Sequence, residues 1–182
     1  MQFSVYSRQA IEAVARPMVR HLIISIRTPG DPRAVRLHPN ECTRGILHLQ
    51  FHDLEEIPAD HIPILGTAGA PVPQHLVVDE TTLFNEGHAL QILDFVRSRA
   101  GDVGEIQVHC DAGWSRSPAV AAALSKALFR QDDSVWFRTK TPNKRVYRMI
   151  LDVHARQQAA VKLPPEGALV LPAAPLQPPH RR

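Results

Sequence analysis

The chain is poor in cysteine and has no long hydrophobic run. Among its 182 residues only Cys42 and Cys110 are cysteines, too few for a disulfide framework. No apolar run approaches the roughly 20 residues that a helix needs to cross a bilayer. The first residues also lack the charged-then-apolar order of a signal peptide. These absences argue against a membrane-spanning or secreted protein, and we expect no membrane partner.

Strong charge and internal repetition are missing as well. Lysine and arginine number 21 against 18 aspartates and glutamates, which gives a net charge of +3. This mild excess suits anionic ligands but does not indicate nucleic-acid binding, and we expect no nucleic-acid partner. Hydrophobic residues make up 44% of the chain, as is normal for a soluble globular protein, and the length suits a single domain.

Apolar segments typical of strands alternate along the chain with segments of helical periodicity. We expect strands over 3–6, 21–26, 46–51 and 106–110, and helices over 8–15, 85–100, 116–129 and from 142 onward. The alternation predicts an α/β fold with a central, mostly parallel sheet flanked by helices. We place this domain over residues 1–161.

The segment 109–118, HCDAGWSRSP, lies between a predicted buried strand and a predicted helix. Amides at the start of a helix have no intrahelical partner, and the loop before this helix is long enough to turn its amides toward one point. Glycine within the loop permits a backbone conformation that other residues resist. We therefore expect an anion-binding cradle, formed by the backbone of Asp111, Ala112, Gly113, Trp114 and Ser115.

Side chains of the same segment suit nucleophilic attack on a phosphate ester. The positive field of the cradle favours a thiolate at Cys110. Arg116 can hold two phosphate oxygens with its planar guanidinium, and Ser117 can donate a hydrogen bond to the sulfur, which helps it leave in a second step. We expect the Asp111 side chain to point outward, because an ionised carboxylate aimed into the cradle would repel the substrate. Trp114 either flanks an aryl ring at the pocket mouth or packs against a neighbouring loop.

The order His-Cys-x-x-Gly-x-x-Arg-Ser at 109–117 resembles the signature of the cysteine-dependent protein tyrosine phosphatases, and it is closest to that of the small dual-specificity enzymes. The resemblance implies a phosphomonoester hydrolase that acts through a cysteinyl-phosphate intermediate on a phosphorylated protein or another phosphomonoester, without cofactor or metal. It also implies that His109 holds the loop and stabilises the thiolate by hydrogen bonding. Asn143 resembles a position where, in the small phosphatases, a helix opens beside the catalytic loop. It either touches the site or only caps its helix.

The proton for the leaving group normally comes from a carboxylic acid. Asp53 follows the predicted strand 46–51 and matches the context of the acid in dual-specificity phosphatases. Asp79 matches the usual sequence distance of that acid to the cysteine, but its surroundings are typical of a turn residue or helix cap. We expect Asp53, with Asp79 as the alternative. The Pro-, Gly- and His-rich segment 55–79 is then an insertion that forms a lid beside the site.

Other hypotheses stay open. The same cradle can belong to a catalytically inactive module that binds phosphate or a phosphopeptide. A second alternative is a metal site, but its five candidate ligands lack any recognised spacing and are better explained as solvated loop residues. These candidates are His52, Asp53, Asp60, His61 and His75. A nucleophilic thiol has to stay reduced, which favours the cytoplasm. The proline-rich residues 162–182 predict an extended or disordered tail.

Overall fold

Four strands form a single sheet in the order β1-β4-β2-β3, and each neighbouring pair is parallel. The computed structural model describes residues 1–14, 17–57 and 78–162. Within these ranges the elements are β1 (Gln2–Ser7), α1 (Arg8–Ala13), β2 (His21–Arg27), β3 (Thr43–Gln50), α2 (Glu86–Arg97), the short 3-10 helix η2 (Ala100–Asp102), β4 (Glu105–Cys110), α3 (Arg116–Phe129), α4 (Ser134–Thr139) and α5 (Lys144–Lys162).

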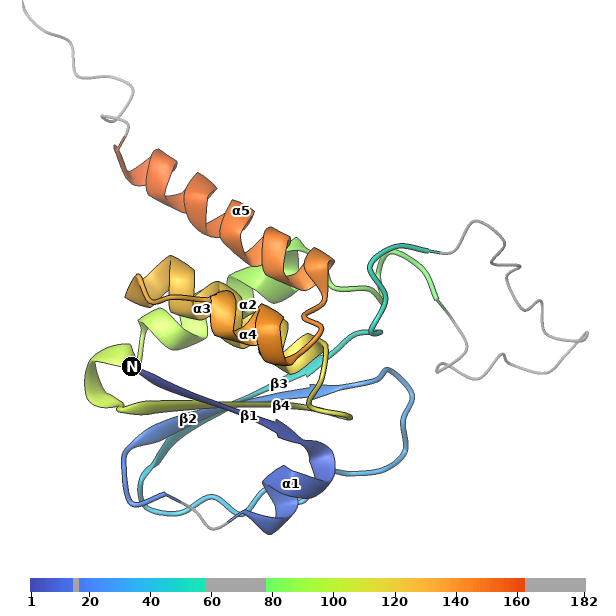
Figure 1. Ribbon diagram of the computed structural model, residues 1–182, viewed down its shortest axis with the longest axis vertical. Coiled ribbons are helices and arrows are strands. Elements are labelled where there is room, and N and C mark those ends of the chain that lie inside the picture. The colour runs from blue at the N-terminus through green and yellow to red at the C-terminus, as the bar shows by residue number, and fades with distance from the viewer. Residues whose placement is uncertain (15–16, 58–77, 163–182) are drawn as a thin grey trace, which may run out of the picture.

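Helices cover the two faces of the sheet unequally (Figure 1). The short helix α1 lies against one face, whereas α2, α3, α4 and α5 lie together on the other. The central strands β2 and β4 are buried along almost their whole length. A parallel strand buried on both faces is expected to be a nearly continuous apolar run, which explains the sequence LIISI within β2.

The main core lies between the sheet and the larger group of helices. Ile106, Val108 and Cys110 of β4 belong to it, because alternate side chains of a strand point to the same face. Every residue of α3 from Arg116 to Ser125 is buried, and α3 contacts both β4 and β1. The strand β4 and the helix α3 are therefore both anchored in the core. This anchoring holds the loop between them in a defined shape.

The predicted α/β fold with a parallel sheet is confirmed, and the strands and helices agree with the hydrophobic pattern except at their ends. The sequence did not predict α4, because its six residues, SVWFRT, are too few to show a helical period. Most of the predicted lid and nearly all of the predicted tail lie outside the described residues. Among the described residues, no helix combines the length and the apolar character of a membrane span.

Candidate functional site

Residues that follow four different strands meet at one edge of the sheet. Because the strands are parallel, their carboxyl ends lie at the same edge, which is the usual position of ligands in such folds. Arg8 follows β1, Thr28 follows β2, Asp53 comes shortly after β3, and Cys110 ends β4. The loop over residues 110–116 lies at this edge, and we call it the phosphate loop after the anion cradle that the sequence predicts there.

The thiol of Cys110 lies on the inner side of the phosphate loop and is only 1% exposed. The backbone N–H of Gly113 donates to its sulfur at 3.2 Å, and the Ser117 hydroxyl lies 3.1 Å from the same atom. Gly113 has a φ of +67°, a left-handed conformation that glycine adopts without steric cost. The structure thus brings together the expected nucleophile, one amide of the expected cradle and the expected hydroxyl donor.

Arg116 is buried with its charge directed at two carboxylates. Its Nη1 donates to the carbonyl oxygen of Phe51 at 2.8 Å, and its Nη2 donates to Asp111 at 2.7 Å. Its Nε lies 3.8 Å from Oδ2 of Asp53. These contacts fix the plane of the guanidinium, and a planar guanidinium in a fixed place suits the binding of two phosphate oxygens.

Asp111 does not point outward as its sequence context predicted. Arg8 contacts its Oδ1, while Thr28 and Arg116 both donate to its Oδ2 at 2.7 Å. Burial acts to raise the pKa of Asp111, but the hydrogen bonds from Thr28 and Arg116 and the charges of both arginines lower it below its ordinary value. The prediction was wrong because Arg8 and Thr28 follow two other strands, and no local pattern shows that they meet the loop.

Asp53 lies against the phosphate loop. Its Oδ1 accepts hydrogen bonds from the Ser115 hydroxyl at 2.7 Å and from the Asn143 side-chain amide at 3.1 Å. Its Oδ2 faces Arg116, and its side chain is 36% exposed. Asn143 also caps α5, since its Oδ1 accepts from the Val146 N–H at 3.0 Å. Asn143 therefore both contacts the site and caps its helix.

Asp79 lies in a turn of its own. Its Oδ1 accepts hydrogen bonds from the hydroxyl and N–H of Thr81 and from the N–H of Thr82. The hydrogen bond from the Thr81 hydroxyl lowers the pKa of this carboxyl most, and the hydrogen bond from the Thr82 backbone lowers it further. Within the described ranges, none of the hydrogen bonds or ion pairs of Asp79 reaches the phosphate loop. Asp79 has the turn contacts that its sequence context predicted.

Trp114 lies on the outside of the loop and is 51% exposed. Its indole N–H donates to the Thr141 hydroxyl at 3.1 Å, and the ammonium of Lys140 lies 4.6 Å from the ring centroid. Trp114 thus packs against the loop between α4 and α5, one of its two expected roles. About half of its surface stays accessible beside the site.

The His109 side chain lies on the opposite face of the sheet from the thiol of Cys110. Its strand neighbours Val108 and Cys110 face the main core, so its own side chain faces the side of the sheet that α1 covers. Burial lowers the pKa of His109 to about 4. Neither ring nitrogen has a hydrogen-bond partner among the residues that the structure describes. The hydrogen bond that the family resemblance implied for this histidine is therefore not among the described contacts.

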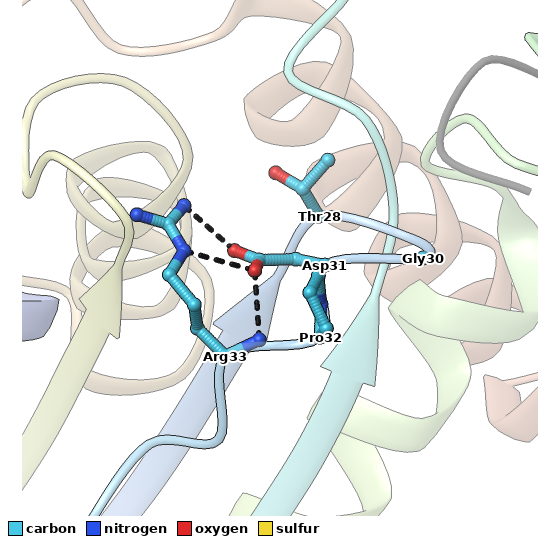
Figure 2. Close-up of a pocket in the computed structure, with 5 residues that line it drawn as sticks. All are labelled: Thr28, Gly30, Asp31, Pro32 and Arg33. Carbon is cyan, nitrogen blue, oxygen red and sulfur yellow. Dashed lines mark hydrogen bonds and ion pairs between the residues drawn. The ribbon is translucent and has the colours of Figure 1, made fainter. Parts of the chain in front are cut away.

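A pocket beside the phosphate loop is lined by Thr28, Gly30, Asp31, Pro32 and Arg33. Figure 2 shows how Arg33 holds the Asp31 carboxylate from one side. Oδ1 accepts from the Arg33 N–H at 2.9 Å and from its Nε at 3.0 Å, and Oδ2 accepts from its Nη2 at 2.9 Å. The sequence predicts a loop over 28–32 but does not by itself indicate a pocket there. The available signal was its position directly after a predicted central strand, whose carboxyl end belongs at the ligand edge.

No group of three or more His, Cys, Asp or Glu side chains in the described part of the chain could hold a metal ion. Three of the five residues weighed as metal ligands, Asp60, His61 and His75, lie outside the described residues.

The chain is similar to solved structures. A variant of human DUSP28 has a TM-score of 0.51 and 17% sequence identity, and the match covers 87% of this chain and 92% of that one. The human tyrosine phosphatase-like serine/threonine/tyrosine-interacting protein has a TM-score of 0.48 and 18% identity, with 77% and 79% covered. No family model matches the sequence, and no curated protein matches it at a significant level.

Proposed function

We propose that this chain, which has the fold of the dual-specificity phosphatases, is a phosphomonoesterase of the protein tyrosine or dual-specificity type. The observation that carries the proposal is the convergence of the Gly113 amide and the Ser117 hydroxyl on the sulfur of Cys110, within 3.2 Å. Arg116 supplies a buried guanidinium at the same loop. A nucleophile, directed donors and a bidentate cation together suit attack on a phosphate monoester.

In the first step the Cys110 thiolate attacks phosphorus, so that an S–P bond forms while the P–O bond to the leaving group breaks. The loop amides and Arg116 stabilise the equatorial oxygens of the transition state. Asp53 gives a proton to the leaving oxygen. We assign this proton to Oδ2, because Oδ1 already accepts hydrogen bonds from Ser115 and Asn143, whereas Oδ2 lies 3.8 Å from Nε of Arg116, beyond hydrogen-bond distance.

In the second step water cleaves the cysteinyl phosphate. Asp53 now accepts the proton of the attacking water, the S–P bond breaks, and its electron pair returns to the sulfur of Cys110. Ser117 donates to that sulfur as it leaves. Inorganic phosphate is released, and no step calls on a metal or cofactor.

Phosphotyrosine is the first substrate we expect. The thiol is buried at the inner side of its loop, a position that a long aryl side chain reaches more easily than a short one. The half-exposed ring of Trp114 lies on the outside of the same loop, where it can flank an aryl group. Because the thiol has to stay reduced, we place the protein in the cytoplasm.

The test is the release of phosphate from a phosphotyrosine peptide in the presence of a chelator, for wild type, Cys110→Ser, Asp53→Asn and Asp79→Asn. We expect Cys110→Ser to abolish turnover. Asp53→Asn should lower kcat by about 100-fold or more, since the peptide's leaving group needs a proton. Asp79→Asn is the matched control and should stay within about threefold of wild type, because its carboxylate is engaged in its own turn.

An activated aryl phosphate adds a second readout. Its leaving group hardly needs protonation, so Asp53→Asn should affect it far less than the peptide. A large loss in Asp79→Asn and none in Asp53→Asn would reverse the assignment of the acid. If the wild type is inert but Cys110→Ser binds the peptide as well as wild type does, the alternative of an inactive phosphopeptide-binding module takes the place of the enzyme.

A further inference from the structure

Asp111 brings a negative charge into a loop that is built to bind an anion. Its Oδ2 lies 2.7 Å from Nη2 of Arg116, the cation that serves the phosphate in the proposed function. An ionised carboxylate at this place repels a phosphate dianion and competes with it for the guanidinium. A second cation has to offset the charge of Asp111 if the loop is to bind phosphate well.

Arg8 is that second cation, and it comes from the first turn of α1. Its Nη2 contacts Oδ1 of Asp111, and its backbone N–H donates to the Asp111 carbonyl oxygen at 3.2 Å. The Arg8 side chain is only 13% exposed, so solvent and salt screen this pair weakly. Main chain and side chain of Arg8 thus both hold Asp111.

Asp31 holds Arg8 in this direction. Its Oδ2 accepts from the same Nη2 of Arg8 at 2.6 Å, and its side chain is 8% exposed. Arg33 binds Asp31 from the solvent side (Figure 2). Charges therefore alternate along a row of five side chains, which are Arg33, Asp31, Arg8, Asp111 and Arg116. Without Arg8, the two carboxylates that share one nitrogen would face each other with no cation between them.

We propose that Arg8 is a positioning residue of the phosphate site, which offsets the charge of Asp111 and so leaves Arg116 available for phosphate oxygens. This inference rests on the proposed function, since it concerns anion binding at the same loop. Arg8 contacts no reacting atom and acts through Asp111. Its role is therefore expected in substrate binding more than in the chemical step.

The first test compares Arg8→Gln with Arg33→Gln. Arg33 is the matched control, because it binds the same Asp31 from the solvent side and is 75% exposed. We expect Arg8→Gln to weaken the binding of tungstate, measured by calorimetry, about tenfold and to raise KM for the phosphotyrosine peptide similarly, while kcat changes by less than about threefold. Arg33→Gln should change either quantity by less than about twofold.

Two more variants separate the effect of charge from a loss of structure. In Arg8→Gln/Asp111→Asn the uncompensated carboxylate is gone, so tungstate affinity should return to within about threefold of wild type. Asp31→Asn removes a negative charge and keeps Arg8, so it should bind tungstate at least as tightly as wild type. A purely structural role predicts weaker binding in both variants, because each breaks a contact of the row.

Wild-type tungstate affinity in Arg8→Gln would overturn the inference. So would a double variant that unfolds at the same temperature as wild type but does not regain its tungstate affinity. If Arg8→Gln does not fold, Asp31→Asn decides alone, and weaker tungstate binding there contradicts the proposal. Calorimetry needs no turnover. A wild type that binds tungstate but hydrolyses nothing therefore refutes the enzyme and leaves the role of Arg8 to be measured by affinity. A wild type that binds no oxyanion contradicts both.

Discussion

Among single residues, Gly113 is the point where the phosphate loop comes nearest to the backbone of β1. A Cβ built at this position would lie 2.5 Å from the backbone nitrogen of Ser7 and 2.6 Å from the carbonyl carbon of Tyr6. Backbone atoms cannot turn aside as the end of a flexible side chain can. The direction of the Gly113 amide toward the sulfur of Cys110 therefore depends on the absence of a side chain.

We expect Gly113→Ala to lower the free energy of unfolding by about 2 kcal/mol or more, because strain at positive φ adds to the clash with β1. Tungstate binding should weaken as well. Denaturant unfolding and calorimetry measure the two effects. Gly101→Ala is the control, since a Cβ there meets no atom within 4 Å, and it should stay within about 0.5 kcal/mol of wild type. Equal stability of the two variants would contradict the close approach at Gly113.

Among the elements, the start of α5 is tied to the phosphate loop. The Asn143 N–H donates to the carbonyl oxygen of Ser115 at 3.2 Å, in addition to the side-chain bond from Asn143 to Asp53. The position of the proposed acid is thus set by the packing of α5 as well as by β3. The Asn143 side chain thus caps α5 and also contacts Asp53, and different substitutions separate these two roles.

We expect Asn143→Ala to destabilise the protein by about 1 kcal/mol, through loss of the helix cap. Asn143→Ser keeps an oxygen for the Val146 N–H but is too short to reach Asp53, so its stability should stay near that of wild type. Both variants should lower kcat/KM for the phosphotyrosine peptide by about tenfold, because Asp53 loses a contact that orients it. An activated aryl phosphate should be affected much less. Peptide hydrolysis at the wild-type rate in Asn143→Ser would show that Asn143 is a helix cap alone.

For the molecule as a whole, buried histidine makes stability depend on pH. Burial lowers the pKa of His109 to about 4 and also lowers the pKa of His88 and His154, against about 6.5 in an unfolded chain. Between these values the unfolded chain binds protons that the folded protein does not. The stabilisation is therefore complete above about pH 6.5 and is lost as the pH falls toward 4.

We expect the free energy of unfolding to decrease between pH 7 and pH 4, with about 3 kcal/mol of the decrease due to His109. Denaturant unfolding at a series of pH values measures it. His109→Gln has no titrating group at this position, so its stability should decline less steeply, whatever its absolute value at pH 7. Parallel pH profiles of the two proteins would mean that His109 is protonated as readily in the folded state as in the unfolded chain.

The fold class and the chemistry of the loop could both be predicted from the sequence. Alternating apolar and amphipathic segments specify strands and helices through local periodicity, and that pattern was sufficient for a parallel α/β sheet. Cys110, Gly113, Arg116 and Ser117 lie within one short segment between a strand and a helix. Neighbours so close along the chain have few ways to be arranged. The structure brings the Gly113 N–H and the Ser117 hydroxyl to the Cys110 sulfur and buries Arg116 at the same loop.

The distant residues that join this loop could not be predicted, because they depend on how the strands pack. Sequence context left Asp53 and Asp79 as alternatives, and Arg8 was not singled out. Asp53 meets Ser115 across 62 positions of sequence, and Arg8 meets Asp111 across 103. Such contacts depend on which strands are neighbours and in what register. β1 lies beside β4 with Ser7 opposite Cys110, which brings Arg8 to Asp111, and the order of strands in a sheet leaves no local mark in the sequence.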